Sequence, residues 1–359
     1  MGQTVPRIPN TLGDITPDWL NQHVFPDHDH APITDLSYRE IGDDRGFLSQ
    51  TILVETTRPT QTPAPERFVV KIRPQTEESR QAEAVLNGFE REVRFYADVA
   101  DKTGARLCEI YFADATADRA ALVMEDLSAF TGGDQVIGLS HEQVKNVVRA
   151  VAPVHAAFWN DPRLDGFHWA PEKDHFTLDS FQAAWPDFES TYGLRIGPEA
   201  RALGAYLADH IDDLDRLVAS RPKSIVHGDL RADNILFGEG AHAGQVIVLD
   251  WQLIMRNLPA LDIARLYGGS EPIMERNHRH RDVVALWHDE LMRHGVTGYS
   301  ADEAWNDFRL AALHCLSIPV KVHSLFDKTP AKRGAQLRDA MAERFFDCAL
   351  DVRALDALR

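Results

Sequence analysis

The segment IVHGDLRADNILF, residues 225–237, constrains this chain more than any other part of its sequence. It places an imidazole (His227), a carboxylate (Asp229) and an amide (Asn234) between two apolar ends. The segment QVIVLDWQ, residues 245–252, follows after a turn that contains glycine, and this pattern predicts a β-hairpin. The question is what chemistry these polar groups serve at the ends of buried strands.

The hairpin can bring three oxygen-bearing side chains to one rim. Asp229 and Asn234 lie five residues apart, and Asp250 ends the returning strand. Carboxylate and amide oxygens are hard ligands that suit Mg²⁺ bound jointly with substrate phosphates, and one carboxylate can be spared as a base. These groups are the equipment of phosphoryl transfer. The simpler alternative is a polar turn with an ordinary capping aspartate.

Bulk properties exclude several classes of protein. The chain has 359 residues, enough for two domains or lobes, and its hydrophobic content of 44% is that of an ordinary globular protein. A formal charge of −17 argues against nucleic-acid binding. The three cysteines are too far apart for a disulfide framework, and no segment has the pattern of a signal peptide or membrane span. We therefore expect a cytoplasmic protein without membrane partners; the sequence does not indicate its oligomeric state.

Hydrophobic patterning divides the chain into a β-rich and a helical part. Strands are predicted at 36–42, 48–57, 67–74, 108–116 and 119–127, with one helix at 77–100. From Ser140 long helices dominate: Ser140 and Gln143 form a capping box, and residues 198–218 are amphipathic. We expect an N-terminal nucleotide-binding lobe at 1–126 and a helical lobe at 127–359 that carries the catalytic and metal-binding loops and the acceptor site.

These motifs resemble a known family. HGDLRADN followed by LDWQ is similar to the catalytic and metal-binding loops of the aminoglycoside phosphotransferase and choline kinase family, distant relatives of the protein kinases. Gln252, FEREVRFY and MEDL are particularly similar to its ecdysteroid kinase-like branch. The resemblance spans about residues 40–270. It implies an α+β, bilobal protein-kinase-like fold, with a small antiparallel sheet lobe containing one key helix and a larger, mainly helical lobe.

The resemblance assigns roles to the residues of the hairpin. Asp229 would orient the acceptor hydroxyl and receive its proton, His227 would fix the loop through hydrogen bonds, and Asn234 and Asp250 would hold Mg²⁺. Gly228 stands where protein kinases have the arginine that senses activation-loop phosphorylation, so regulation of that kind is not expected.

A strand lysine and a helix glutamate are predicted to pair. In FVVKI, alternation places Phe68, Val70 and Ile72 on one face and Lys71 on the other. At ~100° per residue, Glu92 lies about 60° from the centre of the apolar stripe of its helix, whereas Glu90 lies about 100° away and is expected to be exposed. A carboxylate at the edge of a buried stripe needs a partner, and the family position of Glu92 pairs with the strand lysine. The alternative is two unrelated surface charges.

The resemblance also implies a nucleotide site. Met124 would border the adenine, while the Glu125 carbonyl and the Leu127 N–H would pair with it; the alternative is a buried strand end. Gly46 and Ser49 are candidates for a phosphate-covering turn, although the spacing of Gly42 and Gly46 is not that of protein kinases. ATP is the expected donor, and the sequence does not choose between ATP and GTP.

Four other features have simpler interpretations. His155 is expected to be a satisfied core histidine, and Asp262 either braces the catalytic loop or caps a helix. The histidines and aspartates of 23–30 are interpreted as a solvated loop, and the alternating charges of 328–359 as a solvent face. Most aromatic residues of 167–192 are expected to be core, with a minority lining an acceptor pocket: Phe167, Trp169, Phe176, Phe181, Trp185, Phe188 and Tyr192.

The sequence thus predicts an ATP- and Mg²⁺-dependent phosphotransferase that moves the γ-phosphoryl group to a hydroxyl of a small molecule. The aromatic residues of 167–192 would suit an acceptor with a hydrophobic body. A helix predicted soon after Asp250 leaves no room for a long activation loop, which favours a small acceptor. Two alternatives remain open. One is an aminoglycoside-type antibiotic kinase, and the other is a kinase-like protein that binds a nucleotide or metabolite without transferring phosphate.

Overall fold

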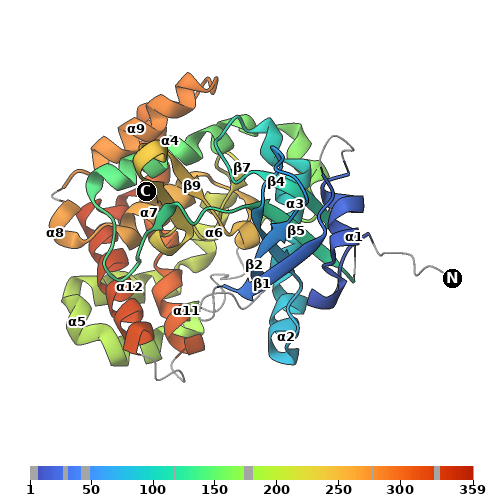
Figure 1. Cartoon of the computed structure of the whole chain (residues 1–359). Helices are drawn as coiled ribbons and strands as arrows, with labels where there is room; N and C mark the ends of the chain where they lie inside the picture. Colours follow the sequence, from blue (N-terminus) through green and yellow to red (C-terminus); the bar gives the residue numbers. More distant parts are fainter. Residues whose placement is uncertain are drawn as a thin grey trace. The chain divides into compact units, whose positions relative to one another are not determined.

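The computed structural model describes residues 7–26, 31–41, 49–116, 118–173, 181–276, 278–326 and 332–358. The chain forms two compact units (Figure 1). The sheet unit consists of Met1–Lys102, Leu107–Phe130 and Asp250–Leu253, and the helical unit consists of Thr103–Arg106, Thr131–Leu249 and Ile254–Arg359.

The sheet unit is built on five antiparallel strands in the order β1-β2-β3-β5-β4. Four of the five strands fall within the ranges predicted from the sequence, and β1 begins one residue before its predicted range of 36–42. Their bounds are β1 Asp35–Glu40, β2 Gln50–Thr57, β3 Arg67–Ile72, β4 Ile110–Ala115 and β5 Ala120–Glu125.

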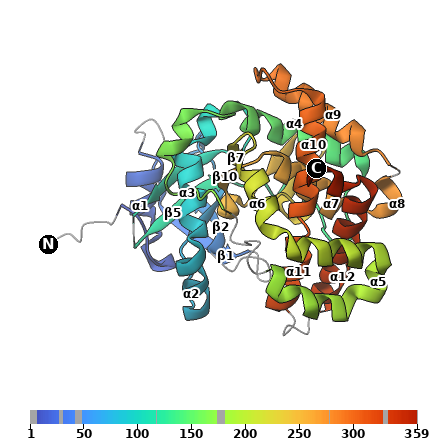
Figure 2. The ribbon, with the colours of Figure 1, turned by 180° about the vertical axis from the view of Figure 1, so that it is seen from behind.

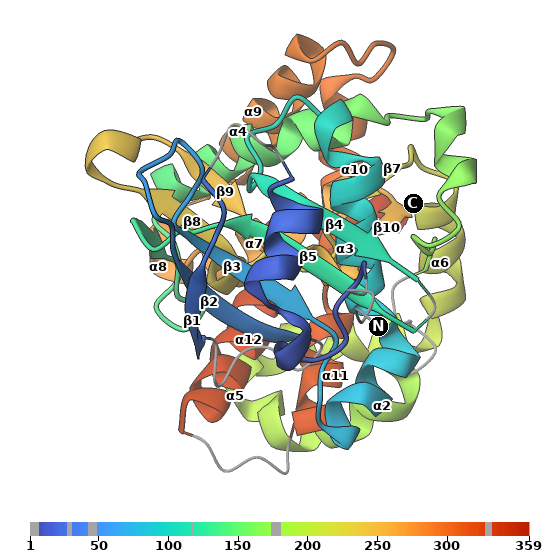
Figure 3. The ribbon, with the colours of Figure 1, turned by 45° about the vertical axis from the view of Figure 1, so that its right-hand side comes forward.

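One face of this sheet is covered by the N-terminal segment of the chain. That segment contains the helical turns α1 (Pro17–Trp19) and Leu20–Val24, and Figure 3 shows it lying across the strands. Phe68, Val70 and Ile72 join it in one buried cluster, as alternation along β3 predicts. Lys71 therefore points to the opposite face.

A helix packs against the opposite face, and its bounds differ from those predicted from the sequence. The single helix predicted for 77–100 is in fact two, α2 (Glu77–Leu86) and α3 (Gly88–Asp98). Asn87 separates them with a backbone φ of 49°. Asparagine tolerates this left-handed conformation better than most residues, and hydrophobic periodicity gives no sign of it.

The helical unit begins with helices that are capped or broken where local chemistry requires it. Helix α4 (His141–Ala157) starts at the predicted capping box, in which Ser140 and Gln143 bond reciprocally. The helix predicted at 198–218 is the second half of α5 (Phe181–Asp209) together with α6 (Ile211–Ala219). Gly197, with φ 85°, kinks α5 at its middle.

The predicted hairpin is present as β8 (Ile235–Gly238) paired with β9 (Val246–Val248). Strand β6 (Phe130–Gly132) pairs with β8, and β7 (Ser224–Val226) pairs with β10 (Met255–Asn257). The polar loop of residues 227–234 thus runs from β7 to β8.

Every residue of α7 (Ala260–Ser270) is buried. The remaining helices are α8 Ile273–Arg276, α9 His280–Arg293, α10 Ala301–His314, α11 Ser317–Phe326 and α12 Lys332–Asp351, of which α9, α10 and α12 pack against α7. Helices α5, α11 and α12 lie side by side (Figure 2). No helix in the described residues is long and apolar enough to cross a membrane.

The rings of α5 belong to this helix packing. Phe181, Trp185, Phe188 and Tyr192 are buried, and Trp185 stacks on Phe181 with ring centroids 5.7 Å apart. A Cβ atom on Gly204 would come within 2.0 Å of the Trp185 ring, so only glycine fits beneath it. These four aromatic residues are core. Phe176 lies outside the described residues, whereas Phe167 and Trp169 are partly exposed.

We predict that Trp185→Ala lowers the free energy of unfolding by about 3–5 kcal/mol, because it leaves a cavity among the rings of α5 and α12. Urea denaturation measures this change. Leu194→Ala on the same helix is the control: Leu194 is 98% exposed, so its truncation should cost less than about 0.5 kcal/mol. Equal effects of the two substitutions would contradict the assignment of Trp185 to the core.

Candidate active site

Asp229 lies in the loop between β7 and β8, between two arginines. Arg265 of α7 bonds Oδ1, and the Nε of Arg231 lies 3.3 Å from Oδ2. Burial by itself raises the pKa of Asp229, but the positive charges of Arg265 and Arg231 outweigh it, and the pKa lies below its ordinary value. The carboxylate is therefore ionised throughout the physiological range.

Asn234 is fixed by its amide nitrogen. Its Nδ2 donates to the main-chain oxygen of Asp229 at 2.9 Å and to Oδ2 of the same residue at 3.2 Å. Both contacts use the donor end of the amide, so the oxygen end points elsewhere and keeps its lone pairs. Asp229 and Asn234, predicted to act together, are thus in direct contact.

His227 connects the loop to the strand that returns toward Asp250. Its Nδ1 accepts the Asp229 N–H at 3.1 Å, and its Nε2 donates to the Leu249 carbonyl at 2.8 Å. Because one ring nitrogen accepts and the other donates, the imidazole is neutral with its proton on Nε2. These bonds position the loop, as the resemblance implied for His227.

Asp262 braces the loop from α7. Its carboxylate accepts the main-chain N–H groups of His227 at 2.6 Å and Gly228 at 2.9 Å. His155 donates from Nε2 to the same group at 3.1 Å, and its Nδ1 accepts from Trp287 at 3.2 Å. Of the two interpretations left open by the sequence, bracing is observed, and His155 is a satisfied core histidine.

Burial and hydrogen bonding oppose each other at Asp262. Burial raises the pKa of this carboxyl, but the hydrogen bonds from His155 and from the His227 N–H outweigh it, and the pKa lies below its usual value. An ionised carboxylate inside an apolar helix therefore depends on three donors.

In the sheet unit, the predicted ion pair of Lys71 and Glu92 is present. The Lys71 Nζ lies 2.8 and 2.7 Å from the two Glu92 oxygens, and both side chains are largely buried. Burial lowers the pKa of Lys71, but the charges of Glu92 and Asp250 outweigh it and hold the pKa above its ordinary value. Lys71 is therefore a permanent cation within the field of two carboxylates.

The segment that carries Asp250 is fastened to α3. The Trp251 ring stacks on Phe95 at a centroid distance of 3.9 Å. Gln252 donates to Glu92 Oε2 at 3.3 Å and approaches the Ser49 hydroxyl at 3.5 Å. Asp250 itself has φ 66°, a left-handed conformation that costs energy for a non-glycine residue and is common at functional sites.

The other predicted nucleotide-site residues lie at the end of β5. Met124 is buried and pairs with Val69 in the sheet, while a Glu125 side-chain oxygen accepts the Glu109 N–H at 2.8 Å. Leu127 begins a turn, in which its carbonyl accepts the Phe130 N–H at 2.9 Å.

Two sequence predictions need correction or fall outside the structure. Glu90, expected to be exposed, is only 21% exposed because it lies 3.8 Å from Arg73 and 3.9 Å from Arg94. Gly46, with Gly42, lies outside the described residues. Within the described part of the chain no group of three His, Cys, Asp or Glu side chains is arranged to hold a metal, and residues 27–30 lie outside it.

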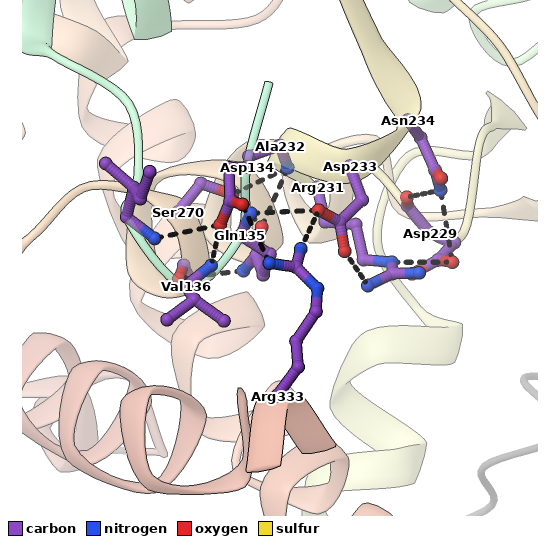
Figure 4. Close-up of polar contacts among 12 residues, drawn as sticks. Asp134, Gln135, Val136, Asp229, Arg231, Ala232, Asp233, Asn234, Ser270 and Arg333 are labelled. Carbon is purple, nitrogen blue, oxygen red and sulfur yellow. Dashed lines mark hydrogen bonds and ion pairs between the residues drawn. The ribbon is translucent and has the colours of Figure 1, made fainter. Parts of the chain in front are cut away.

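Sequence reasoning missed Arg265, Gln135 and Arg333, which contact the loop from distant parts of the chain. Gln135 accepts the Ala232 N–H at 2.8 Å, and Arg333 lies 3.0 Å from Asp233 (Figure 4). Arg265 could have been found from its position in a mostly apolar helix, where a buried charge needs a partner. Arg333 stood in a run of charges typical of a solvent face and gave no such signal.

Comparisons with known proteins show which family the chain belongs to. The sequence model of the phosphotransferase enzyme family matches residues 40–305. Among curated proteins, valine–tRNA ligase of Archaeoglobus fulgidus is 28% identical over 134 residues; the match covers 36% of this chain and 15% of the ligase. The chain therefore spans only a small part of that relative.

Solved structures share the fold over nearly the whole chain. A putative aminoglycoside phosphotransferase from Ralstonia eutropha JMP134 has a TM-score of 0.58 at 19% identity, covering 94% of this chain and 97% of that one. A microcompartment-associated aminopropanol kinase has a TM-score of 0.53 at 17% identity, covering 92% and 97%. The ADP-bound aminoglycoside phosphotransferase APH(2'')-Ib has a TM-score of 0.50 at 15% identity, covering 91% and 97%. These likenesses confirm the predicted α+β kinase-like fold.

We predict that Asp262→Ala lowers the free energy of unfolding by about 3–5 kcal/mol, because two buried N–H groups and His155 lose their acceptor. Chemical denaturation measures the loss. Asp302→Ala, at an exposed position in the first turn of α10, is the matched control and should cost no more than about 1 kcal/mol. A small effect at Asp262 would show that capping, not bracing, is its role.

We also predict that Gln252→Glu destabilises the protein more than Gln252→Ala. The new carboxylate would lie within about 3–4 Å of Glu92, where like charges repel, whereas alanine only removes a hydrogen bond. The difference should be on the order of 1 kcal/mol in thermal or urea unfolding. Equal stability of the two variants would mean that Gln252 does not contact Glu92 in solution.

Proposed function

We propose that this chain, which belongs to the phosphotransferase enzyme family, transfers the γ-phosphoryl group of ATP to a hydroxyl group of a small molecule. The observation that carries the proposal is the fixing of Asp229: its main chain is bonded by His227 and its carboxylate by Arg265, Arg231 and Asn234. A carboxylate held this firmly can orient an acceptor hydroxyl and take its proton.

The low pKa of Asp229 defines how it would act. A carboxylate flanked by two arginines is a weak base, so it accepts a proton only when the acceptor oxygen is already bonding to phosphorus. Its main contribution before that point is to hold the hydroxyl in line with the phosphoryl group. This matches a reaction in which positioning and charge neutralisation provide most of the rate enhancement.

The proposed metal ligands fit Mg²⁺ by donor type. Asn234 keeps its amide oxygen for a ligand, and Asp250 supplies a carboxylate; both are hard oxygen donors. The Asn234 carbonyl accepts the Leu249 N–H at 2.9 Å, and Asp250 is the next residue in the chain. When bound, Mg²⁺ would neutralise the phosphates. Lys71, fixed by Glu92, would bind the phosphates, and Ser49 and Gly46 remain candidates for the turn that covers them.

The adenine would pair with the Glu125 carbonyl and the Leu127 N–H beside Met124. Nucleotide use is supported by family membership, and one structure of the same fold is a complex with ADP. ATP is the proposed donor, and GTP is an outcome of the assay below.

An alcohol is the proposed acceptor class. One structural neighbour is an aminopropanol kinase and another is the aminoglycoside phosphotransferase APH(2'')-Ib. The buried rings of α5 are committed to the core, so any apolar part of the acceptor would have to contact other residues, such as the partly exposed Phe167 and Trp169. The acceptor screen therefore includes both cationic and hydrophobic alcohols.

We predict that Asp229→Asn lowers turnover by about 10²–10⁴-fold and leaves ATP affinity within about threefold, because the loss concerns the acceptor proton. Release of ADP is measured with amino alcohols, aminoglycosides, macrolides, sterols and sugars, with ATP or GTP. Asp250→Ala should instead lose Mg²⁺-dependent nucleotide binding.

Asp289→Asn, whose side chain is 72% exposed on α9, is the control and should behave as the wild type. Near-normal turnover of Asp229→Asn would contradict the proposal. Nucleotide binding by the wild type without ADP release for any acceptor would favour a binding protein with a kinase-like fold.

A further inference from the structure

A chain of alternating charges leads from helix α12 to Asp229 within the helical unit (Figure 4). Arg333, in the first turn of α12, bonds Asp233 at 3.0 Å. Asp233 bonds Arg231 at 2.9 Å, and Arg231 lies 3.3 Å from Asp229. Three ion pairs thus link Arg333 to Asp229, the proposed base, although Arg333 lies about 100 positions away in the sequence.

The two oxygens of Asp233 are both in use. Oδ1 accepts from Arg333 and from the Gln135 N–H, each at 3.0 Å, while Oδ2 accepts from Nη1 of Arg231. The Nη1 of Arg231 contacts Asp233, and its Nε lies 3.3 Å from Oδ2 of Asp229. The side chain of Asp233 is only 9% exposed, so it depends on these donors.

Arginine strongly prefers to bind one carboxylate in a bidentate manner, through two of its nitrogens. If Arg333 is removed, Oδ1 of Asp233 loses a charged donor and becomes available to Arg231. Arg231 can then close a fork on Asp233, and this rotation takes its Nε away from Asp229. The carboxylate of Asp229 would lose one of the two arginines that set its orientation.

We propose that Arg333 is a positioning residue for phosphoryl transfer: it occupies Asp233 so that Arg231 is kept against Asp229. This inference rests on the proposed role of Asp229. Arg333 touches neither nucleotide nor acceptor in this scheme; it acts through Asp233 and Arg231.

Arg333 also has contacts that suit a purely structural role. Arg333 also bonds Asp134 at 2.7 Å, and Asp134 organises its own turn by accepting the N–H groups of Val136 and Ile137. That turn packs closely on the catalytic loop, since a Cβ atom on Gly133 would lie 2.4 Å from the Ala232 carbonyl oxygen. Arg333 could therefore act by holding this turn instead of by occupying Asp233.

The exposure of Arg333 separates the two roles. Its side chain is 43% exposed, so its ion pairs are expected to add little to stability. A positioning role predicts a loss of turnover without a comparable loss of stability, whereas a structural role predicts that both fall together.

The test compares Arg333→Gln with Arg333→Lys, Asp233→Asn and the double variant Arg333→Gln/Asp233→Asn. We expect Arg333→Gln to lower kcat about three- to thirtyfold, with KM for ATP within twofold and Tm within about 2 °C. Arg333→Lys should recover part of kcat, because a lysine supplies the charge without the fork. The double variant should be no slower than Asp233→Asn alone, because both changes act on one chain of contacts.

Two further variants are controls. Arg338→Gln makes the same exchange one and a half turns along α12, away from Asp233, and should leave kcat unchanged. Asp134→Asn removes the other anchor of Arg333 and keeps an oxygen for the local N–H bonds, so it should affect kcat less than Arg333→Gln does. If Asp134→Asn has the same effect as Arg333→Gln, or if the effects of Arg333→Gln and Asp233→Asn simply add, the inference is overturned.

A crystal structure of Arg333→Gln gives a readout that does not need activity. The Arg231 Nε should leave Asp229 and both nitrogens of Arg231 should contact Asp233, whereas Arg338→Gln should keep the original contacts. If the wild type proves inactive with every acceptor but Arg231 moves in this way, the coupling stands and the proposed function fails. If the enzyme is active and Arg231 stays on Asp229, the coupling itself is refuted.

Discussion

The loop of residues 227–234 depends on the hydrogen bonds that the buried carboxylate of Asp262 accepts from it. A charge inside an apolar helix is tolerated only when its oxygens are bonded, and here the donors are His155 and two main-chain N–H groups of the loop. The hydrogen bonds that stabilise the buried carboxylate are therefore also the bonds that fix the shape of the loop. Asp229 directly follows His227 and Gly228, whose N–H groups Asp262 binds, so α7 fixes the position of the Asp229 main chain.

Arginines from three sources complete the environment of this loop. Arg265 comes from α7, Arg231 from the loop itself and Arg333 from α12. Each of them forms an ion pair with an aspartate of the loop. Because the charges alternate, the loop gathers several carboxylates without strong repulsion. The proposed base, Asp229, is consequently weakly basic but held in a fixed orientation. These properties suit phosphoryl transfer, which depends more on positioning than on proton transfer.

Sequence patterns predicted the parts of the structure that short-range periodicity controls. The five strands and the inward-facing Lys71 and Glu92 follow from alternation and helical angle, because each depends on neighbouring residues. The break at Asn87 was missed, since a left-handed residue leaves the hydrophobic pattern intact. The partners of the loop were missed for another reason: Arg265 and Arg333 reach it from other helices, and a charged residue looks the same in sequence whether it meets solvent or a carboxylate.

The placement of Asp250 shows the limit of sequence reasoning most clearly. The sequence placed Asp250 at the end of a hairpin strand, but residues 250–253 pack in the sheet unit, where Trp251 stacks on Phe95 and Gln252 contacts Glu92. One helix, α3, therefore supports both the lysine pair and the segment with the proposed metal ligand. Any displacement of α3 would disturb Lys71, the proposed phosphate-binding cation, and Asp250, the proposed metal ligand, together. Gln252 makes this coupling chemical as well as steric, because its amide bonds to the same carboxylate that fixes Lys71.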